Sequence, residues 1–155
     1  MRTLLPGGVL LGVLLTVSAC SPGLAVDAYP TERGTEIDCK ALYADAPRQV
    51  AGEDAILVED DTAVAWGAPP IILRCGVEKP AILDPEDPAD VPPCNFVDGV
   101  DWVSETTADG YLFTTIGRAF YVSVEVPKDY DPAADALADV AAAVKKHDPS
   151  VTPCE

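Results

Sequence analysis

The stretch VDWVSETTADGYLFTTIGRAFYVSVEV, residues 100–126, decides the fold that this sequence adopts. It holds three runs rich in β-branched and aromatic residues, separated by the turn sequences ADG and GR, a pattern typical of three consecutive antiparallel strands. In the last run every second residue from Phe120 to Val126 is apolar, and the residues between them carry a hydroxyl or a charge. Such alternation predicts a sheet with one face on a core and the other toward water.

A helix is predicted after this sheet, within YDPAADALADVAAAVKKHD, residues 130–148. Asp131 is expected to be its N-cap and Pro132 its first residue, and the basic residues 145–147 lie at the negative end of the helix dipole. Apolar residues recur at helical spacing, so one side of the helix can pack on the sheet. These residues are Leu137, Val140, Ala141 and Val144.

Shorter elements are predicted before this sheet. Asp38 can cap a short helix that stops before Pro47. One or two strands are expected within residues 55–67, and Ile71–Val77 reads as a good short strand. The five prolines of residues 80–93 remove backbone donors and predict a loop. The expected fold class is therefore α+β, an antiparallel β-sheet packed by a C-terminal α-helix and a short N-terminal helix.

The first twenty residues, MRTLLPGGVLLGVLLTVSAC, have the layout of an export signal. Arg2 supplies the positive start, and the apolar stretch from Leu4 to Val17 is too short for a spanning helix, which needs about 20 residues. The end of the segment, VSAC, resembles the lipobox of bacterial lipoproteins. This resemblance implies a signal peptide over residues 1–19 and a lipid on Cys20. A secreted protein with an unmodified cysteine is the alternative.

A lipid on Cys20 would attach the protein to the outer face of the cytoplasmic membrane. Residues 20–36 are rich in Pro, Gly and charge, so we expect a lipidated N-terminus and a flexible tether with an r.m.s. span of roughly 20–25 Å. Residues 37–155 are expected to form one extracytoplasmic domain. The net charge of −16 disfavours nucleic acid as a partner, and reflects either solubility in salty surroundings or attraction for cations and basic partners.

Four cysteines remain after Cys20, and an even number in an oxidising compartment predicts two disulfides. Three pairings are possible. We favour Cys75–Cys94, which would close the proline-rich loop, and Cys39–Cys154, which would join the ends of the domain. A zinc site is disfavoured because no pair has C-x2-C spacing and His147, the sole histidine, is seven residues from the last cysteine.

A second unusual stretch, AVAWGAPPIILRCGV, spans residues 63–77. Its residues 66–77 resemble the signature of an uncharacterised actinobacterial family of secreted proteins and lipoproteins, domain of unknown function 3515. The matching residues are Trp66-Gly67, Pro69-Pro70, Leu73, Arg74-Cys75-Gly76 and Val77. The likeness extends to the signal and lipobox, to Asp101-Trp102, to the following β region and to the Ala-rich final helix. It implies no catalytic residues.

The same stretch is interpreted first as scaffold. Gly67 and the prolines after it let a strand that ends at Trp66 turn into the next one, with Trp66 at the edge of the core. Arg74 is expected to pair with a nearby carboxylate. In the alternative it forms an anion-binding or aromatic pocket with Trp66 and Trp102.

Motifs of known chemistry are missing from the sequence. It contains no serine-hydrolase elbow, zinc-protease motif, phosphate loop or dinucleotide fingerprint, and His147 is explained by the helix terminus. The acidic clusters at 59–61, 84–90 and 98–101 lack the EF-hand pattern. We therefore assign no catalytic residue, metal ligand or cofactor, and an enzyme is the weaker class.

The expected function is that of a membrane-anchored lipoprotein that binds another envelope protein or a cell-wall component. Two alternatives stay open. An envelope enzyme acting on wall fragments would need two carboxylates facing each other at about 5–10 Å, with Asp98, Asp101 and Glu105 as candidates. A cation-binding lipoprotein would use the acidic loops.

Overall fold

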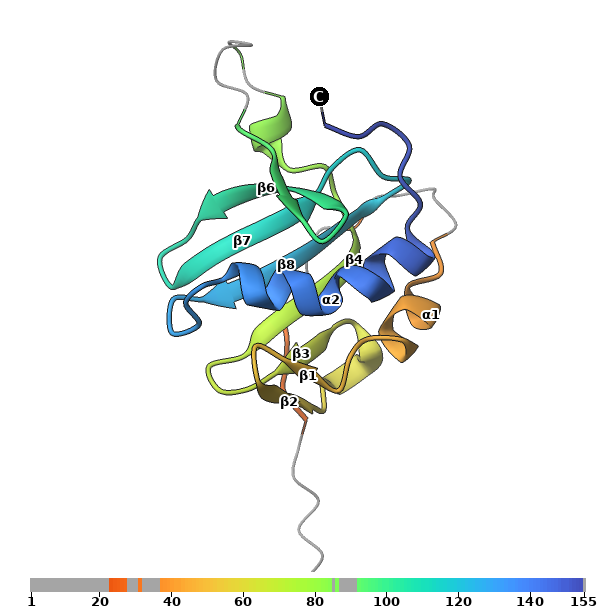
Figure 1. Cartoon of the computed structure of the whole chain (residues 1–155). Helices are drawn as coiled ribbons and strands as arrows, with labels where there is room; N and C mark the ends of the chain where they lie inside the picture. The colour runs from red at the N-terminus through yellow and green to blue at the C-terminus, as the bar shows by residue number, and fades with distance from the viewer. Residues whose placement is uncertain (1–22, 28–30, 32–36, 85, 87–91, 155) are drawn as a thin grey trace, which may run out of the picture.

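The computed structural model describes residues 23–27, 31, 37–84, 86 and 92–154. Eight strands form one antiparallel sheet in the order β1-β2-β3-β4-β8-β7-β6-β5, and helix α2 lies across one face of it (Figure 1). This confirms the expected α+β class with a C-terminal helix and a short N-terminal helix. The elements are α1 (Cys39–Ala44), β1 (Gln49–Val50), β2 (Glu53–Ile56), η1 (Glu59–Asp61), β3 (Val64–Trp66), β4 (Ile71–Val77), η2 (Ala81–Leu83), β5 (Asn95–Val97), β6 (Val100–Thr106), β7 (Gly110–Thr115), β8 (Tyr121–Pro127) and α2 (Ala134–His147).

The four adjacent strands of six or seven residues are the ones that the sequence predicts. β4 coincides with the expected strand at both ends, and β6, β7 and β8 follow the three expected runs. On β8 the apolar positions Val122, Val124 and Val126 are fully buried in the core. The sequence missed β1 and β5, which have two and three residues. Elements this short cannot show a period of two.

The core lies between the sheet and the two helices. Helix α2 buries its predicted apolar stripe, and α1 contributes Leu42. Asp38 caps α1 as predicted, because its carboxylate accepts a hydrogen bond from the Ala41 N–H at 3.0 Å. The prediction that Trp66 covers the edge of the core is wrong. Its ring is fully buried, and its Nε1 donates to the Pro47 carbonyl at 2.9 Å.

The start of α2 differs from the prediction. The helix begins at Ala134, so neither Asp131 nor Pro132 holds its expected capping position. The chain first makes a turn, in which the Tyr130 N–H donates to the carbonyl of Pro127 at 3.1 Å. The Tyr130 hydroxyl also donates to the Pro69 carbonyl at 2.7 Å. This hydrogen bond holds the turn against the loop before β4, so the helix begins only after the turn, at Ala134.

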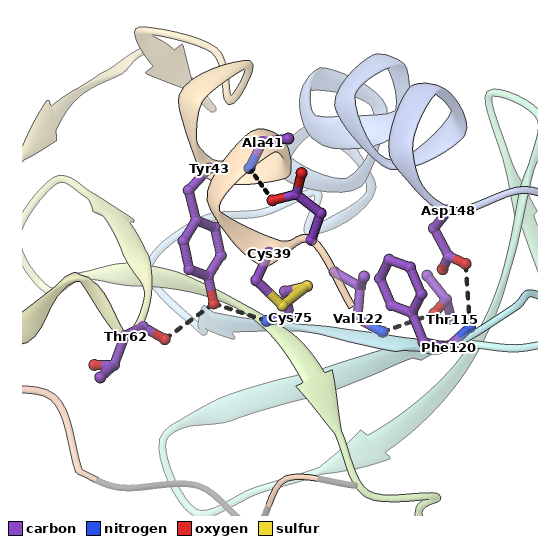
Figure 2. Close-up of a disulfide and its surroundings, with 10 residues drawn as sticks. Cys39, Ala41, Tyr43, Thr62, Cys75, Thr115, Phe120, Val122 and Asp148 are labelled. Carbon is purple, nitrogen blue, oxygen red and sulfur yellow. Dashed lines mark hydrogen bonds between the residues drawn. A yellow bond between two sulfur atoms is a disulfide. The ribbon is translucent and has the colours of Figure 1, made fainter. Parts of the chain in front are cut away.

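Two disulfides join Cys39 to Cys75 and Cys94 to Cys154, and Figure 2 shows the first. The expected pairing of Cys75 with Cys94 and of Cys39 with Cys154 is wrong, and the strand order gives the reason. Cys75 lies on β4 and Cys94 directly precedes β5, with β8, β7 and β6 between them. Four strand spacings of about 4.8 Å separate these residues by about 19 Å. A disulfide needs Cα atoms within about 7 Å.

Part of the expected tether contacts the domain. Leu24 forms a parallel bridge with Val58, and Thr31 forms an antiparallel bridge with Val77. Residues 1–22, which include the expected signal and Cys20, lie outside the described residues. Among the described residues, no helix is long and apolar enough to cross a membrane.

Candidate functional site

The sheet face opposite α2 carries polar side chains at its centre. We call it the polar face and define it by Arg74 on β4, Ser123 and Glu125 on β8, Thr114 on β7 and Glu105 on β6. The strand register sets Arg74, Ser123 and Thr114 side by side across three strands. They are 6%, 0% and 2% exposed, so this face is buried there as well. Alternation along each strand makes it polar, since the neighbouring residues face the core.

A hollow of about 320 Å³ opens over the polar face. It is lined by residues 77–81, which follow β4, and by Glu105, Leu112 and Thr114 of β6 and β7. The chain leaves β4 at a bulge around Gly76, whose φ is +71°. A bulge bends its strand, which here directs the following residues across the polar face. The hollow is thus a gap between a crossing segment and the sheet.

The lining combines apolar side chains with two carboxylates. Glu78 and Glu105 contribute the acids, and Leu112 is among the apolar residues. The Lys79 ammonium lies 2.6 Å from a carboxylate oxygen of Asp84. That hydrogen bond raises the pKa of Lys79 and compensates its charge. A ligand with a cationic group and a short apolar part therefore matches this lining.

Beside the hollow, Arg74 pairs with Glu125. Its Nη1 lies 3.0 Å from Glu125 Oε2, which confirms the predicted partnership with a nearby carboxylate. Ser123 lies on the same face, and its hydroxyl is buried without a hydrogen-bond partner among the residues that the structure describes. Buried hydroxyls are generally paired, so a bound group or water at this position would gain a hydrogen bond.

The alternative pocket of Arg74, Trp66 and Trp102 is not formed. Both indoles are fully buried in the core on the α2 side of the sheet, whereas Arg74 lies on the polar face. Gly67 has a φ of +72°, as a scaffold role at this turn predicts. The sheet thus separates Arg74 from both indoles.

The three carboxylates that the sequence offers for an enzyme, Asp98, Asp101 and Glu105, do not lie at one site. Glu105 lines the hollow, but Asp98 Oδ2 lies 3.3 Å from the Nζ of Lys145. Asp101 lies at the second disulfide, where its Oδ2 accepts a hydrogen bond from the Cys154 N–H at 3.4 Å. Sequence reasoning named Glu105 but not its companion Glu78. The path of the segment after β4 brings Glu78 and Glu105 to the same hollow, and no periodic pattern in the sequence predicts that path.

The likeness noted in the sequence is supported by a match to a family model. The model is that of a protein of unknown function, DUF3515, and it matches residues 4–152. The chain belongs to this family. No curated protein and no solved structure matches the chain. The family match carries no activity, so only the side chains of this DUF3515 protein indicate its chemistry.

A second hollow of about 440 Å³ lies in this DUF3515 protein between α1 and β3. The residues in its wall connect α1 to the sheet. The Tyr43 hydroxyl in its wall donates to the Thr62 carbonyl and accepts from the Cys75 N–H, both at 3.0 Å (Figure 2). Burial raises the pKa of Tyr43, which keeps the phenol protonated as a donor. The adjoining disulfide of Cys39 and Cys75 ties α1 to β4 at the same place.

One group of possible metal ligands occurs among the described residues, formed by Cys94, Asp101 and Cys154. The two sulfur atoms form the second disulfide, and metals bind the thiolate that a disulfide lacks. His147 serves elsewhere, since its Nε2 lies 2.5 Å from Asp45 Oδ2. Hydrogen bonds from Lys146 and His147 lower the pKa of Asp45, so this cluster ties α2 to α1.

Proposed function

We propose that this DUF3515 protein is a lipid-anchored extracytoplasmic domain that acts by binding, with the hollow on its polar face as the binding site. The observation that carries the proposal is the lining of that hollow, where Glu78 and Glu105 stand among apolar side chains. The export signal and lipobox support the anchor. The two disulfides fit an oxidising compartment.

The lining also defines the class of ligand. Two carboxylates in a strongly acidic protein attract an amine, and the charge of Lys79 is already compensated by Asp84. The apolar wall suits a short aliphatic chain. An amine-bearing segment of an envelope protein or of a cell-wall peptide combines both features.

Crosslinking in cells tests the binding role. The lipidated protein is crosslinked, enriched and analysed by mass spectrometry, with Glu105→Gln as the site variant. Asp109→Asn is the matched control, because it removes one negative charge from an exposed carboxylate in the β6–β7 turn. A partner that is lost in Glu105→Gln and retained in Asp109→Asn supports the proposal. An identical partner set in both variants overturns the hollow as the site.

The anchor is tested separately. Cys20→Ala is expected to leave an unlipidated form and to abolish labelling by radioactive palmitate, whereas treatment with globomycin is expected to leave an unprocessed precursor that still carries the label. Unchanged labelling in Cys20→Ala would refute lipidation at this residue.

An envelope enzyme is the second candidate, and one observation favours it. Glu78 and Glu105 line the same hollow, as a pair of hydrolytic carboxylates must. Incubation of the protein with purified peptidoglycan should then release soluble fragments, and Glu105→Gln should release none. Absence of release by the folded wild-type protein rules out this candidate for that substrate.

A further inference from the structure

The segment that follows the lipidation site docks on the domain almost at once. The Leu24 N–H donates to the Leu57 carbonyl at 2.7 Å, and the Leu24 carbonyl accepts from the Glu59 N–H at 2.9 Å. The side chains of Leu24 and Val26 pack against a small apolar cluster on the sheet. This cluster is formed by Val58, Ala63 and Ala65, with Ile72 beside it. Backbone pairing and apolar packing together hold the segment in place.

Docking at Leu24 limits how far the domain can move from a lipid on Cys20. Four peptide steps separate the two residues, and each spans at most 3.8 Å between Cα atoms. The reach is therefore at most about 15 Å. The polar headgroup layer on one side of a bilayer is about 5–8 Å thick. The part of the domain around Leu24 must consequently lie at or just above the headgroups.

The part of the surface next to Leu24 is apolar. Leu57, whose carbonyl binds Leu24, is 72% exposed, and Ile56 is 38% exposed. Both lie at the end of β2, next to the docked segment. Two exposed aliphatic side chains at this position can enter the interface between headgroups and acyl chains. The exposed carboxylates of Glu59 and Asp61 oppose close contact with anionic lipids, so the lipid anchor has to supply most of the affinity.

We propose that the docked segment around Leu24 clamps the domain on the outer leaflet in one orientation, with Leu57 and Ile56 against the lipid. The inference rests on the lipid attachment at Cys20 proposed above. β2 and β3 lie at one end of the molecule and η2 lies at the other (Figure 1). The clamp therefore holds the β2 end at the membrane. The hollow, which adjoins η2 through residues 77–81, then lies toward the end of the domain away from the membrane.

Site-specific photocrosslinking to lipid tests the orientation. The full-length lipidated protein is reconstituted into phosphatidylcholine vesicles with a minor share of phosphatidylglycerol. A benzophenone amino acid replaces either Leu57 or Phe96. Phe96 on β5 is the matched control, since it is also 72% exposed but lies outside the β2 end. The clamp predicts that crosslinking to lipid is several-fold stronger from position 57 than from position 96.

Two further variants separate the clamp from simple anchoring. Inserting about ten Gly and Ser residues after Ser21 adds roughly 16–19 Å of r.m.s. span and leaves the docking residues intact. Leu24→Asp removes the apolar contact instead. The insertion frees the domain from the lipid, so crosslinking from position 57 should fall to the level of position 96. Leu24→Asp should also lower crosslinking to lipid from position 57.

The outcomes distinguish the clamp from the anchor. Flotation of the vesicles reports whether the protein is attached. A protein that fails to float refutes the anchor, and the clamp with it. A protein that floats but crosslinks equally from both positions refutes the clamp alone, as does strong crosslinking from position 57 that survives the insertion.

Discussion

Arg74 Nη1 lies 3.0 Å from Glu125 Oε2, and the two residues sit diagonally across β4 and β8 on the polar face. The Arg74 side chain is 7% exposed and that of Glu125 is 41% exposed. The pair thus joins a buried cation at the centre of the sheet to a carboxylate in contact with water. Its energetic value depends on the burial of Arg74, because removing a charged partner from a cation inside a protein is costly.

Removing the carboxylate is expected to destabilise the domain. Glu125→Ala should lower the free energy of unfolding by about 1–3 kcal/mol, since the guanidinium loses a charged hydrogen bond. Denaturant unfolding measures this change. Asp84→Ala is the matched control, because it breaks the Lys79 pair whose side chains are both exposed. That loss should be at most about 1 kcal/mol. Equal losses in Glu125→Ala and Asp84→Ala would show that the burial of Arg74 does not strengthen its ion pair.

The two tryptophans allow a paired test of a buried donor. Both are fully buried, but Trp66 Nε1 donates to the Pro47 carbonyl, whereas Trp102 Nε1 has no partner among the described residues. Trp66→Phe leaves the partly buried Pro47 carbonyl without its donor, and Trp102→Phe removes a donor that is unsatisfied among the described residues. Trp66→Phe should therefore cost about 1–2 kcal/mol more than Trp102→Phe. Thermal unfolding compares the two variants, and an equal or larger loss in Trp102→Phe contradicts the argument.

The sequence predicts the middle of the sheet because the signal there is local. Alternation along 100–126 reports which side chains face the core, and the apolar stripe of α2 reports its buried side. Strand order is not encoded in this way. β5 joins the outer side of β6, far from β4, although fewer than twenty residues separate β4 from β5 in the chain. A pairing chosen from closeness in sequence was therefore wrong for the cysteines.

The candidate site shows the same limit. The sequence predicts that Arg74 pairs with a carboxylate, and Glu125 is that partner. The separation of Arg74 from Trp66 and Trp102 depends on which face each strand presents across the sheet. The hollow depends on the path of residues 77–81 over β6 and β7, which follows from a bulge and has no period. Glu78 could only be assigned to the site once that path was known.

The disulfides give a prediction about connectivity and stability. Peptide mapping without reduction should recover Cys39 linked to Cys75 and Cys94 linked to Cys154. The bridges close loops with sequence separations of 36 and 60 residues. Replacing either pair by alanine should cost up to about 4 kcal/mol, by the entropy of the unfolded chain. A recovered peptide linking Cys75 to Cys94 would contradict the strand order.

The stability of the domain should depend on pH through Asp148. This residue follows α2, is fully buried, and accepts a hydrogen bond from the Phe120 N–H at 3.2 Å. Burial raises its pKa from 3.8 to about 6. Well below pH 3.8 the group is protonated in both folded and unfolded chains. Above pH 6 the folded protein has to hold a buried charge, so this group lowers stability as pH rises between these values, by up to about 3 kcal/mol.

Asp148→Asn isolates that contribution. The amide keeps the acceptor for Phe120 but cannot ionise, and its buried NH2 adds a cost that does not vary with pH. The difference in Tm between variant and wild type should therefore shift in favour of the variant as pH rises from 4 to 7. Asp109→Asn, at an exposed position, should show little change in its difference over the same range. A difference for Asp148→Asn that stays constant across this range would mean that the carboxyl acts only as a hydrogen-bond acceptor.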